Sequence, residues 1–369
     1  MKRLIEGALA LMFLFMTVGS AKAQKLQVLD PDGNPVGYAH ILNHAGTVVN
    51  MTDLDGTIDL SPFRGVFQGK PAVITHIAFK AQTVNLADAG ETQVVTLQDN
   101  DFEMTEVAVS PKDYIYVQTY FRLIYMADDT VLYYRAGVVD NAYDVKKKKV
   151  SADKHHFSKG RYGLMKFTLD KLMGRTIDNF AVLPSKSTLT ANSDAKVTFT
   201  QETPDRERIS YGNELIGFIV KDREAHRRRT TVDQNVYLRH LWTEKGKSKK
   251  LQRMERKKNN ESKYILIYQM DDDGNCSVED FMMKQTHTEF DSYSKMNNKD
   301  EHTRIWLEVF STDRAYVTKR ELKERKKANR VEMSYAALRQ FEIDHNVPQL
   351  VPQMVERINV LMKKKEKLE

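Results

Sequence analysis

The sequence predicts a mainly β protein with C-terminal helices, in which an N-terminal β-sandwich precedes a larger, sheet-rich α+β domain. Three observations support this fold class. Short runs rich in Val, Ile, Thr and Phe alternate with turn residues up to about residue 110, longer aromatic runs follow, and helix-capping patterns occupy the last part of the chain. The expected ranges are 1–23 for a signal peptide, 24–110 for the sandwich, 111–315 for the sheet-rich domain and 316–369 for the helices.

Residues 1–23 have the pattern of an export signal. Lys2 and Arg3 precede an apolar run at 8–18, and the small residues Ala21 and Ala23 precede Gln24. The apolar run is shorter than the roughly 20 residues that span a bilayer, and every later apolar stretch is interrupted by charge. We therefore expect cleavage before Gln24, no transmembrane segment after the signal, and a mature protein in the periplasm or at the outer-membrane surface. An uncleaved N-terminal anchor is the alternative.

The predicted sandwich consists of short strands separated by turns. Turn residues fill the segments 30–35, which reads Asp-Pro-Asp-Gly-Asn-Pro, and 53–56, which reads Asp-Leu-Asp-Gly. Pro111 lacks the N–H group that a strand ladder uses, so the domain boundary is expected at Ser110-Pro111. The predicted strands lie at 26–29, 39–42, 73–77, 93–97 and 106–109.

The order of these motifs resembles the carboxypeptidase-regulatory-like domain, a transthyretin-like sandwich common at the start of envelope proteins of Bacteroidetes-type bacteria. The resemblance rests on Asp30-Pro31-Asp32-Gly33-Asn34-Pro35-Val36, Thr52-Asp53-Leu54-Asp55-Gly56, Ile77-Ala78-Phe79 and Glu106-Val107-Ala108-Val109. It implies a non-catalytic module in an envelope protein. It covers less than a quarter of the chain and implies nothing about the remainder.

The second domain is expected to begin with a hairpin. Aromatic strands at 114–125 and 131–139 flank a turn at 127–130, and a short helix at 164–173 ends before Gly174. Thr318 and Glu321 form a capping-box pattern, Ser334 can cap a second helix and Pro352 can open a third. Further strands are predicted at 196–200, 215–220, 264–270, 277–290 and 304–310.

No catalytic residue, cofactor or metal site is predicted. The sequence lacks a Gly-x-Ser-x-Gly elbow, a Gly-rich phosphate loop and a His-Glu-x-x-His motif, and its one cysteine, Cys276, lies in a turn. The acidic segment 271–275 departs from a calcium-binding loop, because positions 6 and 12 are Cys276 and Met282. His287 and Glu289 share a strand face but lack a visible third partner.

A basic stretch at 223–258 is the clearest charge feature. Export excludes nucleic acid as a partner, so the expected partners are envelope anions, namely lipid, lipopolysaccharide or acidic glycan, or another envelope protein. A solvated face without a partner is the alternative. The possible anion-binding surface consists of Arg227, Arg228, Arg229, Lys249, Lys250 and Arg253.

Three functions remain open at this stage. The leading expectation is a non-catalytic envelope binding or scaffold protein, because no catalytic constellation is present. The alternatives are a periplasmic lipid or lipoprotein carrier, and an envelope hydrolase with dispersed residues such as His287, Glu289 and Asp271. A deep apolar concavity would favour the carrier, and a cleft with convergent His and carboxylate groups would favour the hydrolase.

Overall fold

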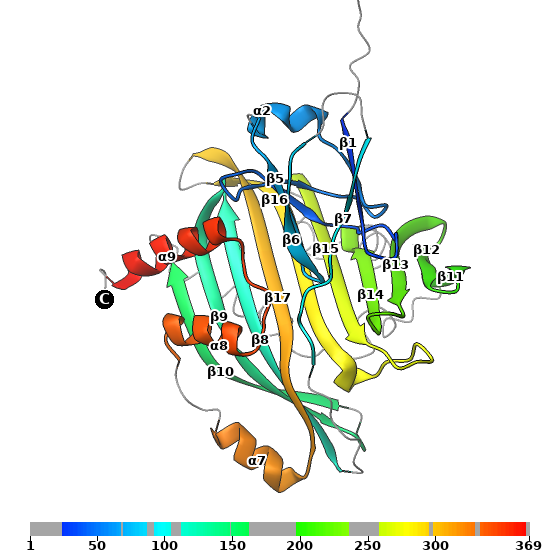
Figure 1. Ribbon diagram of the computed structural model, residues 1–369. Helices are drawn as coiled ribbons and strands as arrows, with labels where there is room; N and C mark the ends of the chain where they lie inside the picture. The colour runs from blue at the N-terminus through cyan, green and yellow to red at the C-terminus, as the bar shows by residue number, and fades with distance from the viewer. Residues whose placement is uncertain are drawn as a thin grey trace, which may run out of the picture.

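The protein combines two packed small sheets with one very large sheet and C-terminal helices (Figure 1). This arrangement, seen in a computed structural model, confirms the predicted fold class. The structure describes residues 24–67, 69–86, 92–104, 112–147, 149–161, 197–235, 258–294, 298–328 and 333–366. The predicted strand at 106–109 and the predicted helix at 164–173 lie outside the described residues.

The N-terminal part is a sandwich of a three-stranded and a four-stranded sheet. The first has the order β4 (Thr57–Asp59), β1 (Lys25–Leu29) and β7 (Thr92–Thr96). The second has the order β3 (Val48–Met51), β2 (His40–Leu42), β5 (Ala72–His76) and β6 (Phe79–Val84). Val28, Ile41 and Ile74 are buried in one apolar cluster, as the alternating pattern requires. Strands β1, β2, β5 and β7 match four of the predicted strands.

Gly56 shows why the second turn needs glycine. Its φ is +70°, and a Cβ atom at this position would lie 2.6 Å from the carbonyl oxygen of Val28. The Asp53 carboxylate accepts hydrogen bonds from the backbone N–H groups of Asp55 and Thr57, which holds the turn closed. The Asp-Leu-Asp-Gly segment therefore forms the predicted turn.

The remainder of the described strands form one antiparallel sheet of ten strands. β17 lies between β8 and β16 and joins the hairpins at 114–161 to the strands at 197–294. Asp128 and Asp129, both with positive φ, turn the chain between β8 and β9 where the sequence predicts a hairpin. The order is β10 (Lys149–Arg161), β9 (Thr130–Asp144), β8 (Tyr114–Ala127), β17 (Lys299–Val317), β16 (Phe281–Ser294), β15 (Lys258–Gln269), β14 (Arg227–Asp233), β13 (Glu214–Asp222), β12 (Arg206–Tyr211) and β11 (Val197–Thr203).

The two faces of the large sheet carry separate apolar clusters. On β8, Tyr120 and Ile124 belong to the cluster that includes the sandwich and the C-terminal helices, whereas Val117, Phe121 and Leu123 belong to the other. The first face is covered by the sandwich, by α8 (Tyr335–Asp344) and by α9 (Pro352–Glu366), as Figure 1 shows. The sandwich and the large sheet therefore share one core.

The C-terminal helices begin where the sequence predicts. Thr318 and Glu321 exchange the two hydrogen bonds of a capping box at the start of α7 (Lys319–Ala328), and the Ser334 hydroxyl accepts from the N–H of Ala337. Among the described helices, none has both the length and the apolar composition that crossing a membrane requires.

Several predicted strands have different bounds in the structure, and two of them show the reasons. The segment predicted as a strand from 277 begins with a 3-10 helix, η2 (Val278–Asp280), because Asp280 accepts from the N–H and hydroxyl groups of Ser277. The strand predicted at 304–310 is the middle of the much longer β17. Its polar flanking residues hid its length, since they break the apolar pattern that predicts strands.

Candidate functional site

Three parts of the chain meet at β8, β16 and β17 of the large sheet. They are the large sheet itself, the four-stranded sheet of the sandwich, and the segment 346–354, which follows α8 and includes the start of α9. We call this place the junction. The antiparallel register of β16 and β17 puts polar side chains directly opposite one another on the covered face of the sheet. The opposed pairs are Gln285 with Glu308, His287 with Trp306, Glu289 with Arg304, and Asp291 with His302.

Arg122 binds the C-terminal segment to the sheet. Its guanidinium forms ion pairs with Glu308 of β17 and, at 3.2 Å, with Glu342 of α8, and it donates at 2.8 Å to the carbonyl oxygen of Pro348. Glu342 is fully buried and also accepts from Tyr120 and Arg339. Two cations and two carboxylates thus balance one another here, so this buried cluster carries no net formal charge.

Three aromatic rings pack together where the sandwich meets the sheet. His40 of β2 stacks on Trp306 of β17 with ring centroids 4.8 Å apart, and His287 of β16 lies 5.0 Å from His40. All three side chains are buried. Within the described part of the chain, His40 Nε2, His287 Nδ1 and Trp306 Nε1 have no hydrogen-bond partner, which is costly for buried polar atoms. Burial lowers the pKa of His40 well below its ordinary value, and the neighbouring His287 adds to this effect.

His287 is the first of several ionisable side chains that contact one another along the sheet. Its Nε2 atom lies 2.6 Å from Glu289, whose carboxylate also approaches His302 and Arg304 at 3.3 and 3.2 Å. Burial raises the pKa of Glu289, but the bonds with His287 and His302 and the charge of Arg304 outweigh it, and the net pKa is below its ordinary value. Burial lowers the pKa of His287, whereas Glu289 and Asp291 raise that of His302.

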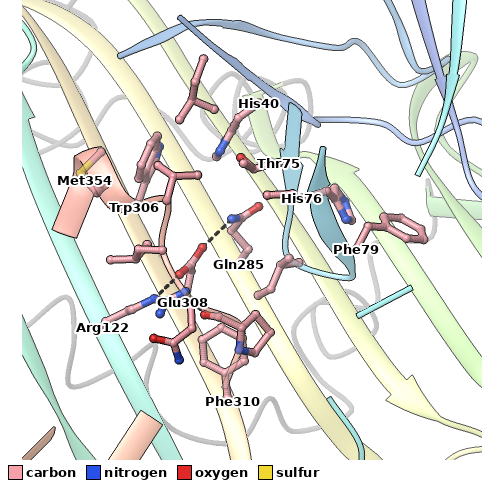
Figure 2. Close-up of a pocket in the computed structure, with 17 residues that line it drawn as sticks. His40, Thr75, His76, Phe79, Arg122, Gln285, Trp306, Glu308, Phe310 and Met354 are labelled. Atoms are coloured by element: carbon pink, nitrogen blue, oxygen red, sulfur yellow. Dashed lines mark hydrogen bonds and ion pairs between the residues drawn. The ribbon is translucent and has the colours of Figure 1, made fainter. Parts of the chain in front are cut away.

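Two adjoining hollows open beside these groups. The junction cavity has a volume of about 70 Å³ and is lined by His40, Thr75, Arg122, Gln285, Trp306 and Glu308, among others (Figure 2). The groove has a volume of about 400 Å³ and runs between β6, residues 100–102 and the loop after α8. Its lining mixes apolar and polar side chains. Phe79, Ala81, Pro348 and Gln349 line both hollows, so the two are neighbours.

The arginines of the predicted anion-binding surface have different surroundings. Arg229 is buried and forms an ion pair with Asp30 of the sandwich at 2.9 Å, and its guanidinium lies over the ring of Phe79. Arg227 donates to the carbonyl oxygens of Asn100 and Phe102 and pairs with Asp99. Arg229 thus holds the sandwich to β14, and Arg227 holds the C-terminal connection of the sandwich to the same strand.

Of the other members of that surface, the structure describes only Arg228. Arg228 points to the Cys276 sulfur atom, 3.4 Å away, and Lys249, Lys250 and Arg253 lie outside the described residues. The anion-binding surface therefore stays a prediction, and it would depend on residues other than Arg227 and Arg229.

The residues of the hydrolase alternative are partly brought together. His287 and Glu289 are in contact, but Asp271 lies in the exposed turn before η2, where it accepts from the N–H of Asn275. His287 is buried beneath the sandwich. The described residues contain no group of three or more His, Cys, Asp or Glu side chains suited to a metal ion.

Sequence reasoning missed His40, Trp306, Arg122 and Glu308. None of them belongs to a motif, and they come from β2, β8 and β17, which are distant in the chain. The sequence could have indicated part of this site. Pairing the predicted strands at 277–290 and 304–310 as a hairpin would have placed Glu289 near Arg304.

Comparison of the sequence with models of known protein families and with curated proteins finds no match.

Proposed function

We propose that the chain is a non-catalytic binding or scaffold protein of the cell envelope, with a carboxypeptidase-regulatory-like sandwich as its first module. One observation carries the proposal: the His40 and His287 imidazoles are buried in the contact between sandwich and sheet, while no histidine is among the described residues that line the larger, open groove. A reacting centre needs a substrate within reach of its acid and base.

The groove has the size and lining of a binding site. Its volume of about 400 Å³ lies within the range of roughly 300–1,000 Å³ found for ligand sites. Ile343 and Pro348 offer apolar surface, and Asn346 and Gln349 offer amide groups. Arg227 holds residues 100–102 to β14, Arg122 holds Pro348 to β8, and Arg229 lies over the ring of Phe79. Because all three walls are held to the large sheet in this way, a ligand loses less entropy on binding.

The carrier alternative receives less support from the described residues. A lipid tail requires a deep apolar pocket. The junction cavity is small and contains Arg122 and Glu308, and the groove contains Lys80 and Asp101. A mixed surface of this kind suits a ligand with hydrogen-bonding groups better than an acyl chain.

Site-specific photo-crosslinking in intact cells tests the proposal. The complete chain, including residues 1–23, would carry the crosslinker at Ile343, which lines the groove and is 56% exposed, or at Val360 on α9, which is 50% exposed and outside the groove. We expect the protein in the envelope fraction, with N-terminal sequence starting at Gln24, and an envelope adduct formed from position 343 but not from 360. A cytoplasmic protein, or equal adducts at both positions, would refute the proposal.

The hydrolase alternative makes a contrasting prediction for Glu289→Gln. If His287 and Glu289 perform catalysis, this variant loses turnover without losing its fold. We expect it instead to lower the stability of the protein, because it removes the carboxylate that His287, His302 and Arg304 share, and to form the same adduct at temperatures where it is folded.

A further inference from the structure

Two residues that line the junction cavity, His40 and Trp306, have buried ring nitrogen atoms that hydrogen-bond to nothing in the described protein. Trp306 Nε1 is always a donor, and His40 Nε2 is a donor or an acceptor according to its tautomer. Figure 2 shows the two rings side by side above Gln285 and Glu308. Unsatisfied buried polar atoms of this kind are rare and indicate a bound water or ligand group.

The size of the cavity limits what it can hold. About 70 Å³ corresponds to roughly two water molecules, at about 30 Å³ each, or to one head group of a few heavy atoms. A larger ligand must place the rest of its body elsewhere. The groove adjoins the cavity at Phe79, Ala81, Pro348 and Gln349 and provides that space.

The charges around the cavity favour an uncharged group. Arg122 and Arg339 are balanced by Glu308 and Glu342 through the ion pairs described above. His40 is held in its neutral form by burial. A carboxylate in the cavity would be desolvated beside Glu308 without a free cation to pair with, which is strongly unfavourable. An uncharged amide avoids this cost, and its oxygen and N–H groups match a donor and an acceptor on the wall.

We propose that the junction cavity binds an uncharged amide group of a ligand whose body lies in the groove, with the amide oxygen accepting from Trp306 Nε1–H and the amide N–H donating to His40 Nε2. This inference rests on the proposed binding function and specifies the chemistry that the site recognises. Free small amides and amide groups of larger envelope molecules share this chemistry. The small cavity provides specificity for the amide, and the groove provides contact area.

The indole resonances of the mature protein report on this site directly. The sequence contains two tryptophans, so two indole N–H signals are expected, and Trp306→Phe identifies that of Trp306. Titration with acetamide should move this signal saturably, and titration with acetate, which has nearly the same shape, should not. Saturation with acetate, or no saturable shift with acetamide because the cavity holds only water, would overturn the proposal.

A pair of variants on β6 tests the connection with the groove. Ala81→Leu fills the boundary between cavity and groove, and Thr83→Leu adds the same side chain on the same face of the strand outside both linings. We expect the crosslink from position 343 to be lost in Ala81→Leu and kept in Thr83→Leu, with equal melting temperatures. A crosslink that persists in Ala81→Leu contradicts the shared site. A crosslink at 343 in wild type without an acetamide response would refute the amide and leave the binding function standing.

Discussion

Arg229 of β14 and Asp30 of the sandwich form an ion pair at 2.9 Å, and the two residues are only 7% and 1% exposed. The two partners are 199 positions apart in the chain. Such a buried pair contributes little when compared with an apolar pair of the same size, but removing one partner leaves an isolated buried charge. The contact therefore acts as a requirement for correct docking of the sandwich on the sheet.

Arg229→Ser should lower the free energy of unfolding by about 3–5 kcal/mol, because Asp30 would be left without its cation. Arg223→Ser is the matched control, since Arg223 pairs with Asp205 on the surface and exposed pairs contribute about 0–1 kcal/mol. Chemical denaturation of both variants gives the comparison. Equal losses of stability would show that Arg229 is not a buried docking residue. The sequence gave no reason to expect Arg229 and Arg223 to differ in this way, because both belong to the basic stretch at 223–258.

Acidification should destabilise the folded protein. Burial lowers the pKa of His40, His76 and His287, so the unfolded chain, with histidine pKa values of about 6.5, binds more protons than the folded one below that pH. Stability should fall as the pH decreases from about 6.5, by up to about 1.4 kcal/mol per pH unit for each histidine. His302 acts in the opposite direction, because its pKa is raised, and it offsets part of the loss.

Urea denaturation on both sides of pH 6.5 measures this slope. His40→Gln should reduce the slope by the contribution of one histidine. A wild-type stability that is constant or rises toward acid would show that these histidines are not buried in their neutral forms.

Variants of Gly33 and Gly56 allow the cost of a positive φ angle to be measured separately from the cost of a steric clash. Gly33 and Gly56 both have positive φ, but only at Gly56 would a Cβ atom meet backbone, namely Val28 O at 2.6 Å and Val36 N at 2.9 Å. Gly33→Ala should cost about 1–2 kcal/mol for its left-handed conformation, and Gly56→Ala should cost clearly more. Thermal denaturation of the full mature chain is the measurement, and equal costs would contradict the crowding at Gly56.

The predicted anion-binding surface can be tested with variants that leave Arg227 and Arg229 unchanged. Changing Lys249, Lys250 and Arg253 together to Ser should weaken binding to anionic vesicles, and added salt should weaken wild-type binding, because the screening length is about 10 Å at 0.1 M. The triple change of Lys319, Lys323 and Lys327 on exposed positions of α7 removes the same charge as a control. Equal losses of binding would mean that net charge alone attracts the vesicles.

Local patterns predicted most of the individual elements. The turn at Asp53–Gly56, the hairpin at Asp128 and the caps at Thr318 and Ser334 depend on neighbouring residues, so the sequence displays them directly. The docking of the sandwich and the junction could not be predicted in this way. They depend on the register of β16 with β17 and on contacts such as Arg229 with Asp30, which no local pattern encodes.

The position of β17 also determines when this sheet can form. β8 and β16 are neighbours of β17 in space, but β8 is made near residue 114 and β17 only near residue 299. Until β17 inserts, a partly formed sheet exists as two pieces with unpaired edges, and β8 is among its most apolar strands. Folding must then await a contact of high sequence separation, which is slow and exposes aggregation-prone edges. The topology therefore requires that the exposed edges of β8 and β16 be protected from aggregation until β17 inserts between them.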